Sequence, residues 1–390
     1  MSAKIILKKN EERRIKSGHL WVFSNEIERR EGDAENGDLI DVFDCHNDFL
    51  ASGFYNKNSL IAVRILDKVS ITDFKSYAEN KIDRAFNLRK IFYPGRNSFR
   101  LVFSESDFMP GLIVDKYNDT FVLQIYSAGM QKYVSDIVSI LQNSYNAKNI
   151  FTKNEEYFRL LEGLPIENET FLGDVNNEII NDGTINYNIN FEKSHKTGFY
   201  FDQSDNRFFI EKISNGKNVL DAFCNSGGFG LHAALAGADS ITFADSSSSE
   251  IDNAKNNFEL NNFSNKSEFV VCDIFEYLEK SASGKNEFDV VMIDPPAFAK
   301  SKKNLAVAKK GYEKLNRLAL QLVSHNGFLV TSSCSHHVSS DEFINIISVA
   351  ASKVGKNIQL IHFNGASLDH PEIPAMPETV YLKFAVFRVF

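Results

Sequence analysis

The sequence predicts an α/β protein whose C-terminal part is a doubly wound, mostly parallel sheet, preceded by a small β-rich domain and an α+β domain. Three observations support this fold class. Residues 193–390 alternate strand-like and helix-like runs, and residues 1–70 hold short strand candidates separated by turns. A glycine turn also follows a buried strand near residue 220. At 390 residues the chain is too long for one typical domain.

The composition is that of an ordinary globular protein, 43% hydrophobic and 24% charged. The chain has no apolar run of about 18 residues and no secretory leader, so we expect a cytoplasmic protein without a membrane span. Its four cysteines are widely separated, so we expect neither a metal site nor a disulfide framework. The net charge of −8 means that any nucleic-acid binding must rely on local basic patches.

Residues 1–70 are expected to form a small β-barrel, because the strands are short and the turns regular. The strand candidates are Ile5–Lys8, Asp38–Phe43, Phe49–Phe54 and Ile61–Leu66. A basic group near the start of the chain, Arg13, Arg14 and Lys16, is a candidate for phosphate contacts. The competing interpretation is a solvated surface turn, which charge runs usually are.

Residues 71–192 are expected to form an α+β domain that connects the other two. The predicted elements are a helix from Phe74 to Ile91, strands Arg100–Phe103 and Phe121–Tyr126, a helix over about 129–142, and a strand Thr184–Phe191. No chemistry can be read from these residues themselves.

Residues 193–390 carry the strand and helix alternation of a doubly wound sheet. The strand candidates are 217–222, 240–244, 268–271, 288–293, 327–332 and 357–363. The chain ends in two closely spaced strand-like runs, Thr379–Phe384 and Ala385–Phe390, which predict an antiparallel edge.

The turn at 225–228 predicts a nucleotide-like ligand. It follows the buried strand 219–223 and precedes a helix from Phe229 to Ala236. Glycine lets the backbone approach a ligand closely, and a helix N-terminus offers unpaired N–H groups. Asp245 ends the next strand, about 20 residues further on, where an acid would meet a ribose. The competing interpretation is an ordinary strand–turn–helix of an unrelated α/β protein.

Reactive or acidic side chains follow five successive strand candidates. In chain order they are Asp221, Asp245, Asp273, Asp294 and Cys334. Because ligands of an open α/β sheet lie outside the carboxyl ends of its strands, we expect these side chains to share one edge. The Asp294-Pro295-Pro296 loop should be stiff, since two prolines fix the backbone and remove two hydrogen-bond donors.

The strand that ends in Asp221, with the short glycine turn after it, resembles the first motif of class I S-adenosylmethionine (SAM) methyltransferases. A dinucleotide fold would instead prefer G-x-G-x-x-G straight after the strand. Methyltransferases that act on amino groups usually place an aromatic residue directly after Asp-Pro-Pro. Here Ala297 takes that position and Phe298 is shifted by one, which counts against a simple N-methyltransferase.

Cys334 points to covalent catalysis. C5 of cytosine is a poor nucleophile, but a thiolate added to C6 makes C5 enamine-like, so that it can attack a sulfonium methyl group. Asp294, hydrogen-bonding at the N3/N4 edge of the base, would stabilise the adduct. The competing interpretation, a buried structural thiol, weakens because Cys334 lies beside the Asp-Pro-Pro loop.

Nearly the full chain resembles the PUA-containing family of bacterial 23S rRNA cytosine-C5 methyltransferases, with PUA denoting a compact RNA-binding barrel. The most specific stretches are Lys193–Gln203, Val219–Gly230, Asp294–Ser301 and Ser333–His337. Further stretches match the PUA domain and the connecting domain: Gly18–Phe23, Ser52–Asn56, Ser59–Arg64, Phe103–Asp107 and Pro110–Asp115.

The resemblance implies SAM as methyl donor, Cys334 as nucleophile and Asp294 beside it. It implies cofactor contacts at Gln203, Asp221, Asn225, Gly227, Asp245, Ser246, Asp273, Ile274 and Asp294. The first two domains would position ribosomal RNA, whose target base must be unstacked to be reached. Basic residues follow the Asp-Pro-Pro loop where an RNA backbone would pass, foremost Lys300, Lys302 and Lys303.

Other functions remain open at this point. A methyltransferase acting on a base nitrogen or on uracil C5 would share the fold and the cofactor. A non-catalytic RNA-binding factor that kept the fold is a third reading. The sequence leaves the target nucleotide and any homo-oligomer undetermined.

Overall fold

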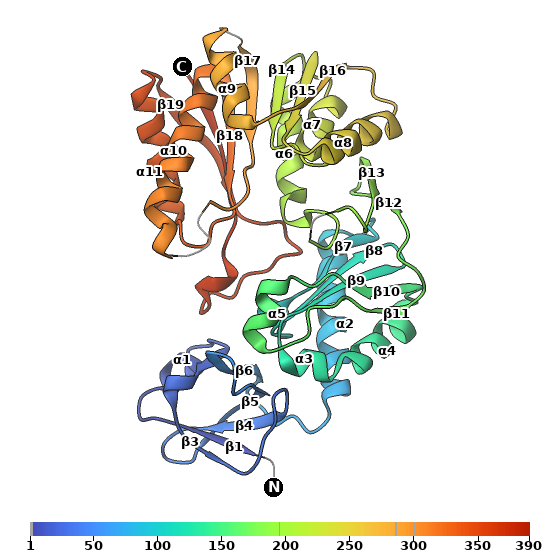
Figure 1. Cartoon of the computed structure of the whole chain (residues 1–390), viewed down its shortest axis with the longest axis vertical. Coiled ribbons are helices and arrows are strands. Elements are labelled where there is room, and N and C mark those ends of the chain that lie inside the picture. The colour runs from blue at the N-terminus through green and yellow to red at the C-terminus, as the bar shows by residue number, and fades with distance from the viewer. Residues whose placement is uncertain (1–2, 195, 285–286, 299–301) are drawn as a thin grey trace. The chain divides into compact units, whose positions relative to one another are not determined.

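The computed structural model describes residues 3–194, 196–284, 287–298 and 302–390 (Figure 1). They form two compact units. Unit 1 comprises Met1–Ile180, Ile189–Phe201 and Leu368–Thr379; unit 2 comprises Asn181–Asn188, Asp202–Ser367 and Val380–Phe390. The predicted division into three domains stays a prediction, because the first two lie within one unit. No helix in the described ranges is long and apolar enough to cross a membrane.

The N-terminal part of unit 1 is a six-stranded mixed sheet in the order β2-β6-β5-β4-β1-β3. Its elements are β1 (Lys4–Leu7), α1 (Glu12–Lys16), β2 (Trp21–Phe23), β3 (Ile27–Glu31), β4 (Leu39–Phe43), β5 (Phe49–Tyr55) and β6 (Ile61–Asp67). The four predicted strands are confirmed, but β2 and β3 were not predicted. β3 reads Ile-Glu-Arg-Arg-Glu with four exposed residues, so it carries no alternating apolar pattern.

The second part of unit 1 is a five-stranded sheet in the order β11-β10-β9-β8-β7. Its elements are α2 (Phe74–Phe92), β7 (Ser98–Phe103), β8 (Leu112–Tyr117), β9 (Thr120–Ile125), α3 (Ala128–Lys132), α4 (Val134–Tyr145), β10 (Asn149–Thr152), α5 (Glu156–Glu162) and β11 (Thr170–Leu172). The single helix predicted over 129–142 is two helices, because the backbone leaves the helical conformation at Tyr133. The alternating run predicted as strand 184–191 forms the shorter β13 (Asn186–Ile189), paired with β12 (Glu178–Asn181).

Buried ion pairs join the two parts of unit 1. Glu105, which follows β7, accepts hydrogen bonds from the indole of Trp21 at 2.8 Å and from Arg64 at 2.9 Å. Arg64 also donates to Glu162 at 2.9 Å. Burial acts to raise the pKa of Glu105, but the Arg64 charge and hydrogen bonds lower it overall. The Glu105 carboxylate therefore stays charged while it accepts hydrogen bonds from Trp21 and Arg64.

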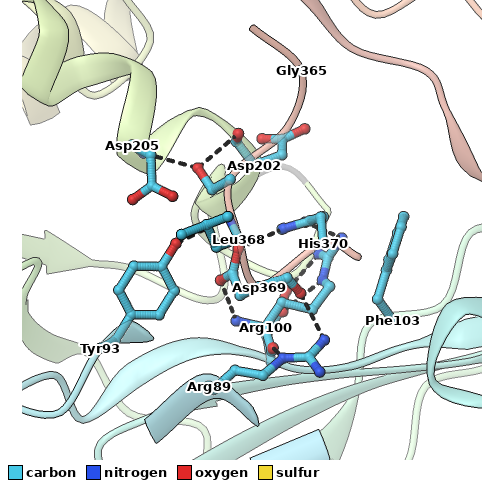
Figure 2. Close-up of polar contacts among 12 residues, drawn as sticks. Arg89, Tyr93, Arg100, Phe103, Asp202, Asp205, Gly365, Leu368, Asp369 and His370 are labelled. Atoms are coloured by element: carbon cyan, nitrogen blue, oxygen red, sulfur yellow. Dashed lines mark hydrogen bonds and ion pairs between the residues drawn. The ribbon is translucent and has the colours of Figure 1, made fainter. Parts of the chain in front are cut away.

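A late segment of the chain, Leu368–Thr379, completes unit 1. Met376 is fully buried in the apolar core of the N-terminal sheet. Asp369 packs against the second sheet, where its carboxylate accepts from the Arg100 backbone N–H at 2.9 Å and contacts His370 at 2.7 Å (Figure 2). One short segment therefore contributes to both parts of the unit.

Arg89 is the centre of the polar cluster around this segment (Figure 2). It is 0% exposed and donates to both carboxylate oxygens of Asp107, each at 2.7 Å. It also donates to the backbone oxygens of Asp369, at 2.7 Å, and Arg100, at 2.9 Å. A guanidinium can satisfy four such acceptors because its five N–H groups form a rigid fork.

In unit 2 the described residues form a seven-stranded sheet in the order β16-β15-β14-β17-β18-β20-β19. Its strands are β14 (Asn218–Ala222), β15 (Ser240–Asp245), β16 (Lys266–Val271), β17 (Phe288–Ile293), β18 (Val323–Ser333), β19 (Ile358–Asn364) and β20 (Lys383–Val389). Its helices are α6 (Ser204–Ser214), α7 (Gly228–Leu235), α8 (Ser248–Leu260), α9 (Ile274–Ser283), α10 (Leu305–Leu322) and α11 (Ser340–Lys353). The strand and helix alternation predicted for this region is confirmed.

The end of the chain differs from the prediction. Instead of two strands, a short 3-10 turn at Pro377–Thr379 is followed by one strand, β20. No turn residue separates Phe384 from Ala385, and six of the seven β20 residues are buried. An apolar run covered on both faces continues as one strand. β20 is the antiparallel strand, and it lies between β18 and β19, one position in from the edge.

Candidate active site at the carboxyl edge of the sheet

Five parallel strands of unit 2 end along one edge. Ala222 of β14 pairs with Ala244 of β15 and with Ile293 of β17, and Ile293 pairs in turn with Thr331 of β18. The five side chains predicted to share this edge lie within three positions of these pairs or of the end of β16. The structure therefore brings Asp221, Asp245, Asp273, Asp294 and Cys334 to the same edge, as the sequence predicts.

The turn after β14 has an unusual backbone. Phe223, Asn225 and Gly227 all have positive φ, at 61°, 47° and 84°. Asparagine and glycine tolerate this region, whereas for phenylalanine it is uncommon and costs energy. A side-chain carbon added to Gly227 would lie 3.1 Å from Cβ of Ala254, so the turn packs closely on α8. The backbone is thus held tightly where the sequence predicts a ligand.

Two carboxylates accept hydrogen bonds from the backbone of this turn and of the helix that follows it. Asp221 is 1% exposed and accepts a hydrogen bond from the Gly230 N–H at 2.7 Å, inside the first turn of α7. Asp245 accepts from the backbone N–H groups of Asn225 and Ser247, each at 3.0 Å. Asp245 is only partly buried, and each carboxylate oxygen has a further lone pair. It can therefore accept from a ligand hydroxyl while holding the turn.

The remaining predicted cofactor residues differ in exposure. Asp273 is exposed and caps α9 by accepting from the Glu276 N–H at 3.0 Å. Ser246 is also exposed. Ile274 is 2% exposed and belongs to the apolar core, so contact with a ligand would involve its backbone.

Gln203 positions Asp294. It is 3% exposed, and its amide nitrogen donates to Asp294 Oδ2 at 3.1 Å and to Ser332 Oγ at 3.3 Å. Its amide oxygen accepts from Asn206 at 2.7 Å. Both N–H groups of Gln203 are therefore used within the protein.

The charge state of the site is sensitive to pH. Burial and the nearby charge of Asp202 raise the pKa of Asp294 to about 7. Burial also raises the pKa of Asp221 to about 7, with Asp294 adding to the effect. The Arg207 guanidinium acts in the opposite direction on both carboxyl groups. Two perturbed acids on neighbouring strands are typical of a functional site.

Cys334 follows β18 and is partly exposed. The residue after it, Ser335, is fixed by two neighbours. Its hydroxyl contacts the Tyr312 hydroxyl at 2.9 Å, and its carbonyl accepts from the Lys383 ammonium at 2.7 Å. The thiol is thus placed by a rigid segment at the same edge as Asp294.

The other three cysteines are less suited to nucleophilic chemistry. Cys224 is buried, and burial raises the pKa of its thiol well above the ordinary value. Burial and Asp273 raise the pKa of Cys272. Cys45 lies in a turn of unit 1, whereas the carboxyl edge of the sheet belongs to unit 2. A raised pKa leaves less thiolate, which is the reactive form.

The basic residues predicted to meet RNA fall in both units. On α1, Arg14 pairs with Glu26 at 2.8 Å, Lys16 lies 3.5 Å from Asp44, and Arg13 is exposed. In unit 2, Lys302–Asn304 form a 3-10 turn before α10, and Lys303 is exposed. Lys300 lies outside the described residues. The RNA contacts therefore stay predictions, and Arg14 already has an acidic partner.

Two basic residues of the site were missed. Arg207 lies one helical turn after Gln203, a spacing that places both on one face, and its side chain fits against Gly228. A side-chain carbon on Gly228 would come within 2.5 Å of Arg207 Nε. Lys383 is far from Cys334 in sequence and reaches it only through the pairing of β20 with β18. The i, i+4 spacing from Gln203 could have indicated that Arg207 belongs to the site. No comparable sequence pattern indicates this for Lys383.

Comparison with known proteins agrees with this architecture. Residues 5–68 match a PUA-like domain family, and residues 201–363 match the family described as conserved hypothetical protein 95. Two solved structures cover 99% of this chain and 99% of their own at 20% identity. One is SMU.776, a putative methyltransferase complexed with SAH (TM-score 0.85), and the other is a putative SAM-dependent methyltransferase from Streptococcus mutans (TM-score 0.83). The fold is therefore the α/β methyltransferase fold with an N-terminal PUA-like domain.

Full-length relatives give the family. Proteins named ribosomal RNA large subunit methyltransferase I from Yersinia pestis and Yersinia pseudotuberculosis are 34% identical over 403 residues, with 100% of both chains covered. The chain belongs to the ribosomal RNA large subunit methyltransferase I family.

Proposed function

We propose that this protein transfers a methyl group from SAM to C5 of a cytosine in large-subunit ribosomal RNA, through a covalent adduct with Cys334. The observation that carries the proposal is the placement of a partly exposed thiol and the Asp294 carboxyl at the ends of adjacent strands, β18 and β17. Membership of a family named for large-subunit rRNA methylation supports the substrate class.

The turn after β14 fits SAM. Asp245 can still accept hydrogen bonds from ribose hydroxyls. Gly227 packs closely on α8 and places no side chain over the turn. Asp221 is buried and accepts a hydrogen bond from the backbone of α7, the helix that follows the turn. Asn225, Ser246, Asp273 and Ile274 complete the predicted contacts at this edge. When bound, SAM supplies an electrophilic methyl group on a sulfonium.

The residues of the chain would act in a definite order. The Cys334 thiolate adds to C6 of the base, forming an S–C bond and placing electron density at C5. Asp294 would hydrogen-bond at the N3/N4 edge of the base and stabilise the adduct. C5 then takes the methyl group, a base removes the C5 proton, and the returning electron pair breaks the S–C bond.

The target cytosine must leave its stack to meet this edge, so we propose an unstacked or single-stranded region of the RNA. The PUA-like domain of unit 1 is the proposed positioning module, with exposed Arg13 on α1 and Lys303 before α10 as backbone contacts. A cytoplasmic location and a homo-oligomer stay predictions.

The decisive test is trapping with 5-fluorocytosine. We expect rRNA carrying this base, incubated with enzyme and SAM, to form a denaturation-stable complex whose RNA-linked peptide contains Cys334, because fluorine cannot leave as a proton does. An absence of adduct, with the same RNA unsubstituted being methylated in parallel, would contradict the mechanism. Mass spectrometry of the methylated nucleoside separates the other outcomes, a base nitrogen or uracil C5. Absence of SAM binding in calorimetry would indicate a non-catalytic RNA-binding factor.

SAM affinity is expected to rise with pH. Burial raises the pKa of Asp221 and of Asp294 to about 7 when no ligand is bound. A cationic ligand favours their charged forms and lowers both pKa values, so below pH 7 binding must release protons. One released proton gives about a tenfold gain in affinity between pH 6 and pH 8, levelling off above that. Isothermal titration in buffers of different ionisation enthalpy measures both the affinity and the protons released.

The matched control lies at the other end of the same strand. Asp289 is near the start of β17, where it accepts from the Asn218 N–H at 3.0 Å. Asp289→Asn should leave the pH dependence unchanged, whereas Asp294→Asn should weaken it. A dissociation constant that stays flat between pH 6 and pH 8 in the unmodified protein would show that neither carboxyl group is coupled to SAM.

A further inference from the structure

The Lys383 side chain runs alongside Cys334. Lys383 pairs with Ser333 across β18 and β20, and its ammonium reaches the carbonyl of Ser335 at 2.7 Å. Cys334 is the residue between these two anchor points. The lysine therefore starts opposite the residue before the thiol and ends on the residue after it.

The lysine is held in this position. It is 3% exposed, and its nitrogen also donates to the Tyr381 carbonyl at 2.8 Å. Among the described residues, no carboxylate contributes to the pKa of Lys383. A buried ammonium without a carboxylate is costly unless another anion balances it, and burial lowers the pKa of Lys383 to about 8. A charged Cys334 acts to raise that pKa.

The other titratable groups nearby do not fill this role. The Tyr312 hydroxyl on α10 is engaged with Ser335, and burial raises its pKa. The His336 ring contacts the ring of Tyr381 in a tilted arrangement, with 5.5 Å between ring centroids. Asp294 on the neighbouring strand is held by Gln203.

We propose that Lys383 accepts the thiol proton of Cys334 and holds the nucleophile as a thiolate paired with an ammonium. The inference rests on the proposed role of Cys334 as the nucleophile. In this step the S–H bond breaks, an N–H bond forms, and no electron is exchanged with a third group. A neutral amine donates its two N–H groups to the two carbonyls and keeps its lone pair for the incoming proton.

The pKa of Lys383 lies close to that of an ordinary thiol. An unperturbed thiol has a pKa of about 8.5, close to the value of about 8 for Lys383. Transfer of the proton therefore costs little, and the attraction between the resulting charges favours the pair in a partly buried site. After the S–C bond breaks at the end of the cycle, the thiolate returns to the same partner.

The test measures the thiol directly. The full-length protein is alkylated with iodoacetamide between pH 6 and pH 9.5, and modification of the Cys334 peptide is followed by mass spectrometry. We expect the unmodified protein to react with an apparent pKa below about 8.5, the ordinary thiol value. Lys383→Met should raise that pKa by at least about one unit, slowing alkylation near pH 7 about tenfold. Lys383→Arg cannot accept the proton but keeps a positive charge beside the thiolate, so it should keep the thiol pKa low and isolates the contribution of the ion pair.

A second lysine provides the matched control. Lys356 is partly buried and donates to the Val323 carbonyl, at the opposite end of the strand that leads to Cys334. Lys356→Met should leave the Cys334 profile unchanged. The proposal is overturned if Lys383→Met leaves the profile unchanged, or if the unmodified thiol titrates at or above pH 9. This second criterion needs no variant, so it holds even if Lys383→Met fails to fold.

The alkylation test is independent of methyl transfer. If the fluorocytosine trap fails while the Lys383 variants shift the thiol profile, the proposed function falls and the proton transfer stands. If the trap succeeds while the Lys383 variants leave the pH profile of Cys334 alkylation unchanged, only the proposed role of Lys383 is contradicted.

Discussion

Replacing Cys334 with alanine is expected to lower the rate of cytosine-C5 methylation by about 10⁴-fold or more, because the covalent route to an activated C5 is removed. SAM binding should change little, since Cys334 is not among the residues that hold the turn after β14. Single-turnover methylation of rRNA with labelled SAM measures the rate, and calorimetry measures the binding. The two measurements together separate lost chemistry from lost cofactor.

Cys45→Ala is the control for this experiment. Cys45 is a partly exposed cysteine like Cys334, but it lies in a turn of unit 1. It should retain the activity of the unmodified protein. If Cys334→Ala remains nearly as active as Cys45→Ala, the methyl group is transferred without a cysteine adduct, as on a base nitrogen.

Replacing Arg89 with methionine is expected to lower the free energy of unfolding of unit 1 by about 3–5 kcal/mol. The substitution leaves the buried Asp107 carboxylate without its bidentate partner and the Asp369 carbonyl without a donor. The loss of a counter-charge matters more than the lost contacts, because a buried carboxylate alone is strongly disfavoured. Adding Asp107→Leu to the variant should therefore recover part of the stability.

The sequence provides a specific probe for this measurement. Trp21 is the single tryptophan of the chain and lies in unit 1. Its fluorescence during urea unfolding therefore reports on that unit. Arg84→Met, at an exposed position of the same helix, is the control and should change the stability by about 0.5 kcal/mol or less. Equal unfolding curves for the two variants would show that the Arg89 cluster contributes little.

Much of unit 2 could be predicted because its signals are local. Buried parallel strands read as short apolar runs, and the polar residue that ends each run marks the carboxyl edge. This was enough to bring Asp221, Asp245, Asp273, Asp294 and Cys334 together. The glycine requirement at Gly227 also follows from a local backbone conformation.

What could not be predicted depends on partners distant in sequence. The run that ends in Val389 reads equally well as one strand or two, and only its place between β18 and β19 selects one. Lys383 gains its position from the same pairing. The hydrogen bonds from the Gln203 amide to Asp294 and Ser332 join residues far apart in sequence, and its predicted cofactor contact stays a prediction.

The segment Leu368–Thr379 delays the completion of unit 1 until most of unit 2 has been synthesised. Unit 1 begins at the N-terminus, yet Asp369 and Met376 are translated only after β14 to β19 of unit 2. A nascent chain that ends before them has an unfilled position in the core of the N-terminal sheet and lacks the carbonyl that accepts from Arg89. Domains usually finish folding from the N-terminus onward during translation. Here unit 1 emerges first from the ribosome but is completed only just before unit 2, whose last strand, β20, directly follows this segment in the chain.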